Sequence, residues 1–153
     1  MKTPNENQWI ANFENSLPMS LLMAREAVMA RFTPVLREHG LSPQQWRVMR
    51  VLAESKDAMD ATELSRRCCL MMPSLSRILR SMEARQLLTR SSDLNDHRRL
   101  LVSITAIGRA LHKELTPYNA ARFADIERIV GREKLEQLHQ LLSETITTLK
   151  QHS

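Results

Sequence analysis

Two arginines at the end of a short polar run are the first residues in this sequence that could do chemistry. The run 91–99 carries two aspartates and two arginines, and the five residues after it, Leu100–Ile104, are mostly apolar and indicate a strand. A charged tip on a strand is either a solvated turn or a binding element for a negatively charged partner. Asp96 stands two residues before Arg98, and we expect it to orient that guanidinium through a paired contact.

Arginine is concentrated in the segment that leads to this tip. Residues 65–99 hold eight arginines and three acids with no lysine, so the net charge of the segment equals the +5 of the whole chain. Such an excess is the electrostatic footprint of a phosphate-backbone binder, although many basic faces are simply solvated. The eight positions are Arg66, Arg67, Arg77, Arg80, Arg85, Arg90, Arg98 and Arg99.

Two helices separated by a tight turn are expected to position these arginines. Asp60 begins a capping-box-like start for a short helix through Arg67, and Pro73 opens a second helix to about Gln86. The second helix has an apolar stripe at helical spacing, formed by Leu75, Ile78, Leu79 and Met82. Its other face carries Ser74, Ser76, Arg77, Arg80, Ser81 and Arg85. These are helix-turn-helix proportions, with a recognition helix suited to the major groove of DNA.

The rest of the chain supplies a mainly helical frame. We expect helices over Leu17–His39 with a kink at Pro34, Pro43–Glu54, Thr105–Val130 with a bend at Pro117, and 132–149, and strands over Leu87–Arg90 and Leu100–Ile104. The two strands form a wing that holds Arg98 and Arg99 beside the recognition helix, within reach of phosphates or a minor groove. The predicted fold class is therefore mainly α, a winged helix-turn-helix lobe plus a helical region from both chain ends.

The composition excludes several classes of protein. A chain of 153 residues with 42% hydrophobic and 25% charged residues is typical of one soluble domain. No apolar run approaches a membrane span, and the first residues lack the apolar core of a secretory signal, so we expect a cytoplasmic protein with no membrane partner. No nucleophile–base pair, phosphate loop or metal-spaced cluster occurs, so we expect neither an enzyme nor a cofactor or metal site.

These motifs resemble those of the MarR family of bacterial winged-helix regulators, and the resemblance covers nearly the whole chain. The wing, Asn-Asp-His-Arg-Arg at 95–99, is similar to the family's Asp-x-Asp/Asn-x-Arg pattern, although His97 occupies a position often held by Arg, Lys or Gln. The recognition helix opens on Pro-Ser-Leu-Ser-Arg at 73–77, as in the family. By position, the resemblance implies that Arg98 and Arg99 enter the minor groove. It also implies that bases and phosphates are faced by Ser74, Ser76, Arg77 and Arg80.

The resemblance further implies a homodimer on a pseudo-palindromic operator in double-stranded DNA. The expected boundaries are one domain over 17–149, with a DNA-binding lobe at 41–105, dimerisation helices at 17–40 and 106–149, and an N-terminal extension at 1–16. The stretch 21–54 is similar to the subgroup that represses operons for degradation of homoprotocatechuate and related aromatic acids. It implies a nucleoid-associated repressor that a small aromatic carboxylate releases from DNA.

Arg25 is the sequence's own indication of an effector site. It interrupts the apolar stripe of the first helix, where a lone buried charge would cost several kcal/mol, so we expect an anionic partner. A neighbouring glutamate and the carboxylate of an aromatic acid both meet that need. His39 lies farther along the same side and Trp46 opens the next helix, so the expected ligand site is Arg25, His39 and Trp46.

Two alternatives stay open at this stage. Cys68 and Cys69 are adjacent, without disulfide or metal spacing, which is typical of small buried side chains on a helix. Oxidation of either thiol beside Arg66 and Arg67 would instead make a redox-sensing repressor of the same fold. The other alternative is a protein that binds DNA without an effector.

Overall fold

The computed structural model describes residues 12–153, so residues 1–11 of the expected N-terminal extension lie outside the described part. The chain divides into two compact units, the first ending at Thr116 and the second spanning Pro117–Ser153. A short 3-10 helix, η1, spans Phe13–Asn15. None of the described helices is both long enough and apolar enough to cross a membrane.

The first expected helix is two helices. α1 spans Leu17–Met29 and α2 spans Thr33–Glu38, with a turn at residues 30–32. The prediction of a single kinked helix was wrong because Pro34 occupies the N-terminal turn of α2. Its ring lacks an N–H for residue 30 and clashes with the carbonyl there, so the preceding helix ends first. The Thr33 hydroxyl donates to the Met29 carbonyl at 2.9 Å, which satisfies one of the last acceptors of α1.

α3 (Pro43–Glu54) and α4 (Ala61–Cys68) begin where the sequence predicts. The Ser42 hydroxyl accepts the backbone N–H of Gln45 at 3.1 Å, and the Gln45 side chain accepts the Ser42 N–H at 2.9 Å. This reciprocal pair is a capping box. Asp60 caps α4 by accepting a backbone N–H two residues on at 2.7 Å. Both helices therefore start at positions that local side chains define.

α5 (Met72–Ala84) follows α4 after a tight turn. Cys69 makes the turn in the left-handed region, at φ 50° and ψ 48°. α5 ends two residues before the predicted position because Gln86, at φ 59°, has left the helical region. Its inward stripe is close to the expected one: the buried residues are Leu75, Leu79 and Met82. The pair α4 and α5 is the helix-turn-helix.

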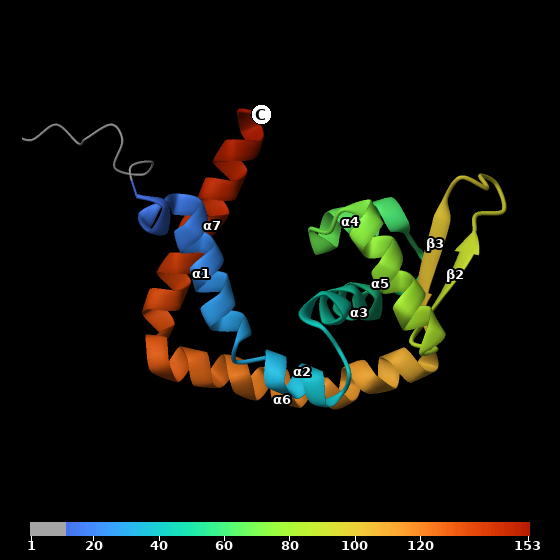
Figure 1. Ribbon diagram of the computed structural model, residues 1–153, viewed down its shortest axis with the longest axis horizontal. Helices are drawn as coiled ribbons and strands as arrows, with labels where there is room; N and C mark the ends of the chain where they lie inside the picture. Colours follow the sequence, from blue (N-terminus) through green and yellow to red (C-terminus); the bar gives the residue numbers. More distant parts are fainter. Residues whose placement is uncertain (1–11) are drawn as a thin grey trace, which may run out of the picture. The chain divides into compact units, whose positions relative to one another are not determined.

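Three short antiparallel strands lie beside these helices. β2 (Leu88–Ser92) and β3 (Leu100–Ile104) form the predicted hairpin, with Leu88 opposite Ile104. β1 (Met59–Asp60) pairs with the other edge of β3, which gives the order β1-β3-β2. A two-residue strand cannot show the alternation that reveals strands in a sequence, so β1 was not predicted. Figure 1 draws the hairpin next to α5, which β2 contacts.

The core of the first unit draws side chains from α2 to α5, from the sheet and from the start of α6 (Ala106–Val130). Its fully buried members include Leu36, Val48, Met49, Leu52, Leu64, Leu75, Leu79, Met82, Leu88, Val102 and Leu115. The Thr105 hydroxyl accepts the Gly108 N–H at 3.0 Å and so caps α6, as predicted. A Cβ at Gly108 would lie 2.2 Å from the Leu87 carbonyl oxygen, so the first turn of α6 packs tightly against the backbone between α5 and β2.

The second unit consists of the rest of α6 and α7 (Arg132–Gln151), joined at Gly131 with φ +95°. Few of its side chains are buried. Its exposed large apolar residues are Tyr118, Phe123, Ile129, Val130, Leu138, Leu141, Ile146 and Leu149. So much exposed apolar side chain on two helices is typical of surfaces that pack against another molecule.

Candidate DNA interface and effector pocket

The outward face of α5 is polar and basic. Because one side of the helix is fixed in the core, Arg77 and Arg80 point away from it and are exposed. Ser74 is exposed on the first turn, and Ser76 is half-buried at the edge of the face. The structure therefore places the four predicted α5 residues on one helix, with both guanidinium groups accessible.

The tip of the β2–β3 hairpin is a hydrogen-bonded turn. The Arg99 N–H donates to the Asp96 carbonyl at 3.0 Å, and the Asp96 carboxylate accepts the Arg98 backbone N–H at 3.0 Å. The contact expected between Asp96 and the Arg98 guanidinium is replaced by this backbone contact. Asp96 therefore shapes the turn that carries Arg98, as an Asx turn does, and within the described part of the chain its carboxylate makes no ion pair with the Arg98 guanidinium.

Arg99 ties the wing to the helix-turn-helix. Its Nε donates to the Asp60 carboxylate at 2.8 Å, and its guanidinium lies 3.4 Å from the Asp93 carboxylate. Asp60 also caps α4, so one carboxylate serves the wing and the helix start. The Arg99 guanidinium, followed by the backbone N–H of Thr62, holds the pKa of Asp60 below its usual value. Arg99 is engaged inside the protein before any ligand arrives.

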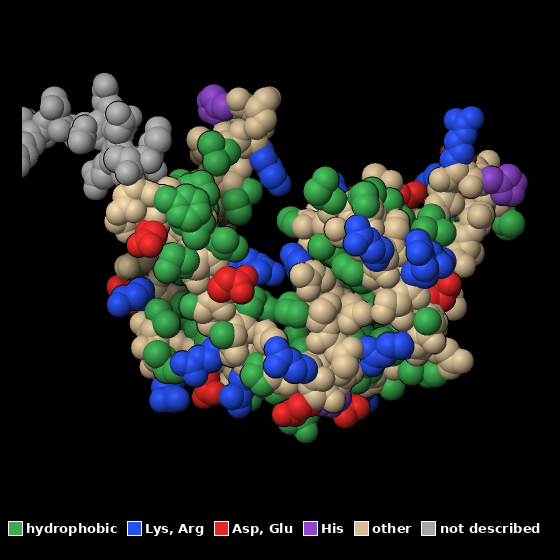
Figure 2. Space-filling view, viewed as in Figure 1, with side chains coloured by type: hydrophobic (Ala, Val, Ile, Leu, Met, Phe, Trp, Pro, Cys, Tyr) green, Lys and Arg blue, Asp and Glu red, His purple; other side chains and the backbone are tan. Residues whose placement is uncertain are grey.

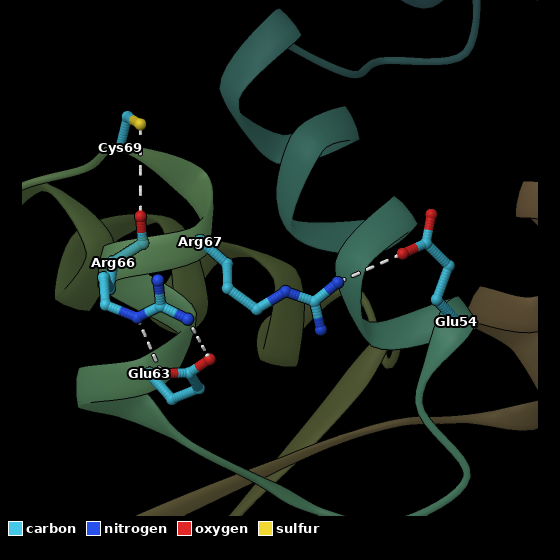
Figure 3. Close-up of polar contacts among 5 residues, drawn as sticks. All are labelled: Glu54, Glu63, Arg66, Arg67 and Cys69. Carbon is cyan, nitrogen blue, oxygen red and sulfur yellow. Dashed lines mark hydrogen bonds and ion pairs between the residues drawn. The ribbon is translucent and has the colours of Figure 1, made fainter. Parts of the chain in front are cut away.

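The two arginines of α4 are held by glutamates (Figure 3). Arg66 Nε donates to Glu63 at 2.9 Å, one helical turn away, and Arg67 donates to Glu54 of α3 at 3.1 Å. All four side chains are substantially exposed, so these pairs orient the arginines more than they stabilise the fold. Each arginine is neutralised by its glutamate, so we expect these two arginines to attract phosphate less than an unpaired arginine does.

Two further arginines connect elements within the first unit. Arg90 of β2 donates to Glu83 of α5 at 2.9 Å and lowers the pKa of that carboxyl group. Arg85, at the end of α5, donates to the backbone carbonyl of His39 at 3.0 Å and to that of Gly40. The two hydrogen bonds of Arg85 join the recognition helix to the C-terminal end of α2.

Three of the eight arginines in residues 65–99 have guanidinium groups that are not engaged in the contacts described above. Among residues 12–153, the guanidinium groups of Arg77, Arg80 and Arg98 take part in none of the described ion pairs or side-chain hydrogen bonds, and Arg98 contributes only its backbone N–H to Asp96. They lie on the outward face of α5 and at the wing tip, and Figure 2 shows Lys and Arg side chains over α5 and near that tip. These three guanidinium groups are the candidate contacts for an external polyanion.

An open pocket of about 770 Å³ lies on the first unit among α1, α2 and the start of α3. Arg25 and Arg37 both line it. Arg25 is exposed rather than buried in an apolar stripe, and it pairs with Glu26 at 2.8 Å, the simpler of the two partners expected for it. α1 has no buried residue in the described chain, so apolar side chains of this helix such as Leu21 and Val28 are exposed as Arg25 is.

The other two predicted ligand residues have internal roles in the described chain. The His39 ring contacts the Val35 carbonyl at 2.9 Å and Glu114 at 3.3 Å, which raise its pKa. Trp46 is buried and stacks on His112 with ring centroids 5.2 Å apart. Neither is among the residues that line the pocket. Their role in ligand binding stays a prediction.

The cysteines lie at the end of α4. Cys68 is buried, and burial raises the pKa of its thiol, which disfavours the reactive thiolate. Cys69 is exposed, and its sulfur lies 4.0 Å from the Arg66 carbonyl (Figure 3). The guanidinium groups expected to activate a thiol are paired with glutamates instead. The charges of Arg47 and Arg67 act on the Cys68 pKa in the opposite direction to burial, but burial has the larger effect.

Sequence reasoning missed two contributors to these sites. Arg37 lines the pocket beside Arg25, but its exposed position on a six-residue helix gave no periodic signal. Arg85 was assigned to the basic face of α5, whereas it binds carbonyls at the end of α2. Its position at the helix end, where the chain turns, was the available clue.

Comparisons with known proteins identify the family and the fold of this chain. Residues 39–99 match the model of the MarR family. The homoprotocatechuate degradative operon repressor of Escherichia coli is 42% identical over 132 residues, covering 86% of this chain and 88% of the relative. The HTH-type transcriptional regulator FarR of Neisseria gonorrhoeae is 37% identical over 84% of this chain and 88% of its own.

A solved structure extends the likeness to three dimensions. The crystal structure of NadR in complex with 4-hydroxyphenylacetate superposes with a TM-score of 0.80 at 33% identity, covering 90% of this chain and 100% of that one. The predicted fold class and the family resemblance are confirmed. This chain belongs to the MarR family of winged-helix transcriptional regulators.

Proposed function

We propose that this protein is a homodimeric repressor that binds a pseudo-palindromic operator, with α5 in the major groove and the wing tip at the flanking backbone or minor groove. The observation that carries the proposal is the sorting of the arginines. Arg77, Arg80 and Arg98 are uncompensated and lie on the two elements that reach DNA in winged-helix proteins. The other five arginines of the segment support the lobe.

The exposed apolar helices support the dimer. Large apolar side chains such as Phe123, Leu138 and Leu149 are exposed in the second unit, and a symmetry mate would cover the same surface on both copies. In this proposal residues 41–105 form the DNA-binding lobe, while 17–40 and 106–149 form the dimerisation region. Two copies of α5 then read two half-sites.

Selection of duplexes from a randomised pool by the full-length protein tests this function. We expect inverted repeats whose half-sites are about one helical turn, roughly 10 base pairs, apart. Light scattering should give twice the mass of the chain at micromolar concentration. A monomer, or selected duplexes without a repeat, would remove the proposal.

We further propose that a small aromatic carboxylate binds in the pocket at Arg25 and Arg37 and lowers operator affinity. A guanidinium binds a carboxylate through two parallel hydrogen bonds. Two arginines and two glutamates, Glu26 and Glu38, line the pocket, and among the ion pairs of residues 12–153 Arg25 pairs with Glu26 while none involves Arg37. Support also comes from the relatives: one represses a homoprotocatechuate degradative operon, and NadR was solved with 4-hydroxyphenylacetate. The effector can weaken the DNA complex only if it prefers a dimer with wrongly placed recognition helices.

The path for such a preference starts at α2. This short helix lines the pocket with Arg37 and Glu38, and its terminal carbonyls are bound by Arg85 of the recognition helix. A shift of α2 on ligand binding would therefore act on α5 through two hydrogen bonds. A coupling typical of allostery would weaken operator binding by about 5–150-fold.

Titration calorimetry with 4-hydroxyphenylacetate, followed by operator binding with and without it, tests the effector. Arg25→Ala should leave operator affinity nearly unchanged and abolish the response, and Arg25→Lys should respond partially because it keeps charge without two-pronged geometry. Arg31→Ala is the matched control, since Arg31 is exposed on the adjacent turn and does not line the pocket. A normal response in Arg25→Ala would place the effector elsewhere.

A further inference from the structure

Met71 is the more exposed of two apolar residues at the start of the recognition helix. Its side chain is 78% exposed, and it stands immediately before α5 in an extended conformation, at φ −70° and ψ 146°. The next residue, Met72, is 41% exposed. Two accessible methionines therefore precede Ser74 and Arg77 on the helix assigned to DNA.

The fold gives no reason for methionine at this position. Met71 is the N-cap of α5 and makes no side-chain capping hydrogen bond, whereas Ser42 and Asp60 cap α3 and α4. A serine or aspartate at an N-cap stabilises a helix by accepting one of its free N–H groups, and methionine cannot. Its exposure also means that it contributes little to the core. Selection for stability alone would favour a polar residue here.

The chemistry of the major groove supplies an apolar partner. Residues at the N-terminal end of a recognition helix are those that meet base edges. The 5-methyl group of thymine is the apolar feature that the groove presents, and the unbranched, polarisable methionine side chain adapts to such a surface. The uncompensated Arg77 and Arg80 follow on the same helix, so the occupant of this face carries phosphates.

We propose that Met71 contacts the 5-methyl group of a thymine in the major groove and sets a preference for thymine at one position of each half-site. The inference rests on the proposed binding of α5 to DNA and adds a residue that determines sequence specificity. It separates two tasks on one helix: the arginines contribute affinity for any duplex, and Met71 discriminates one base.

The test uses the full-length protein and a duplex obtained by selection from a randomised pool. Each thymine of that duplex is replaced in turn by deoxyuridine, which removes only the methyl group. We expect one position per half-site at which replacement weakens wild-type binding by about three- to fivefold, the effect of one buried methyl group. Met71→Ala alters both protomers of the dimer, so it should bind the unmodified duplex more weakly by about the square of that factor, roughly ten- to 25-fold. It should show no penalty for deoxyuridine at that position.

Two controls make the result specific. Arg80→Ala should bind every duplex more weakly but keep the wild-type penalty for deoxyuridine. The thermal unfolding midpoint of Met71→Ala should match that of the wild type, because the side chain is exposed. If Met71→Ala keeps the full deoxyuridine penalty, or wild type has none, Met71 does not read thymine even though DNA binding stands. If no duplex is selected at all, the proposed function and this inference are both overturned.

Discussion

The outer face of α5 with the wing tip and the supporting layer of α4 with the base of the wing use the same residue type for opposite purposes. In the outer region no ion pair of residues 12–153 involves Arg77, Arg80 or Arg98. In the supporting region Arg66 and Arg99 are each bound to an acid. The positive charge of the segment is thus distributed, with compensation where the lobe is built and excess where a ligand would arrive.

This difference changes how the net charge should be read. The segment carries the whole excess of the chain, but the paired arginines present much of their charge to a neighbouring acid. Long-range attraction of DNA depends on the whole field, whereas direct phosphate contacts need a guanidinium that has free donors. Variants in the two regions should therefore differ sharply in their effects on DNA binding.

Arg98→Ala should give the largest effect. It removes an uncompensated donor at the wing tip, and the loss of one charge-assisted contact is about tenfold in affinity per protomer. A dimer loses two such contacts, so affinity for specific and non-specific duplexes should fall together. The slope of log affinity against log salt should decrease by about one per protomer. Fluorescence anisotropy at several salt concentrations measures both quantities.

An unchanged affinity and salt slope in Arg98→Ala would show that the wing tip does not reach DNA. Arg77→Ala tests the outer face of α5, as Arg98→Ala tests the wing tip. Because α5 is expected in the major groove, this variant should lose more on a selected duplex than on a random one.

Arg85→Gln tests an arginine held by carbonyl groups rather than by an acid. It removes the charged groups that donate hydrogen bonds to the backbone carbonyls of His39 and Gly40, and it keeps a polar side chain. Operator affinity without effector should stay within about threefold, but the response to 4-hydroxyphenylacetate should fall by about tenfold if α2 transmits it. Competition binding with and without the acid gives the coupling. A full wild-type response in this variant would leave Arg85 as a local cap only.

Arg99→Ala should act on the wing rather than on DNA directly. Because Arg99 holds the pKa of Asp60 below its usual value, their pairing stabilises the fold at pH values above that usual value and is lost as pH falls through the lowered pKa. The variant should raise the Asp60 pKa toward normal, measured by carboxyl NMR titration, and weaken DNA binding by only about a few-fold. Arg98→Ala should leave the Asp60 pKa unchanged, and equal effects of the two variants on it would contradict the assignment.

The frame of this lobe could be predicted because its signals are local. Ser42 followed by a proline sets the start of α3, and the apolar stripe of α5 fixes which of its faces is outward. The break after α1 was missed because the apolar spacing continues across it, and only the ring of Pro34 decides that a helix starts there. β1 was missed because its two residues are defined by a partner strand.

The state of each arginine could not be predicted for the same reason. Arg99 meets Asp60 across 39 positions of sequence, and Arg85 meets His39 across 46, so both contacts exist only after the elements pack. Spacing predicted a basic face correctly at Arg77 and Arg80. It could not separate a guanidinium that is free from one that already has a partner.

Arg66→Ala should have the smallest effect, and for that reason it tests the comparison most directly. Arg66 carries the same charge as Arg98 and lies in the same basic segment, so a model based on net charge alone predicts a similar loss of affinity. Its guanidinium is instead bound to Glu63 within α4, and both side chains are largely exposed. Removing an exposed pair of this kind changes stability little, and it removes no free donor. Operator affinity and the salt slope should therefore remain within about twofold of wild type. Glu63→Ala is the complementary variant: it frees Arg66, and DNA affinity should rise slightly if a released guanidinium at that position reaches phosphate. If Arg66→Ala instead weakens binding as strongly as Arg98→Ala, the paired arginines also contact DNA, and the division between a supporting layer and an outer face does not hold.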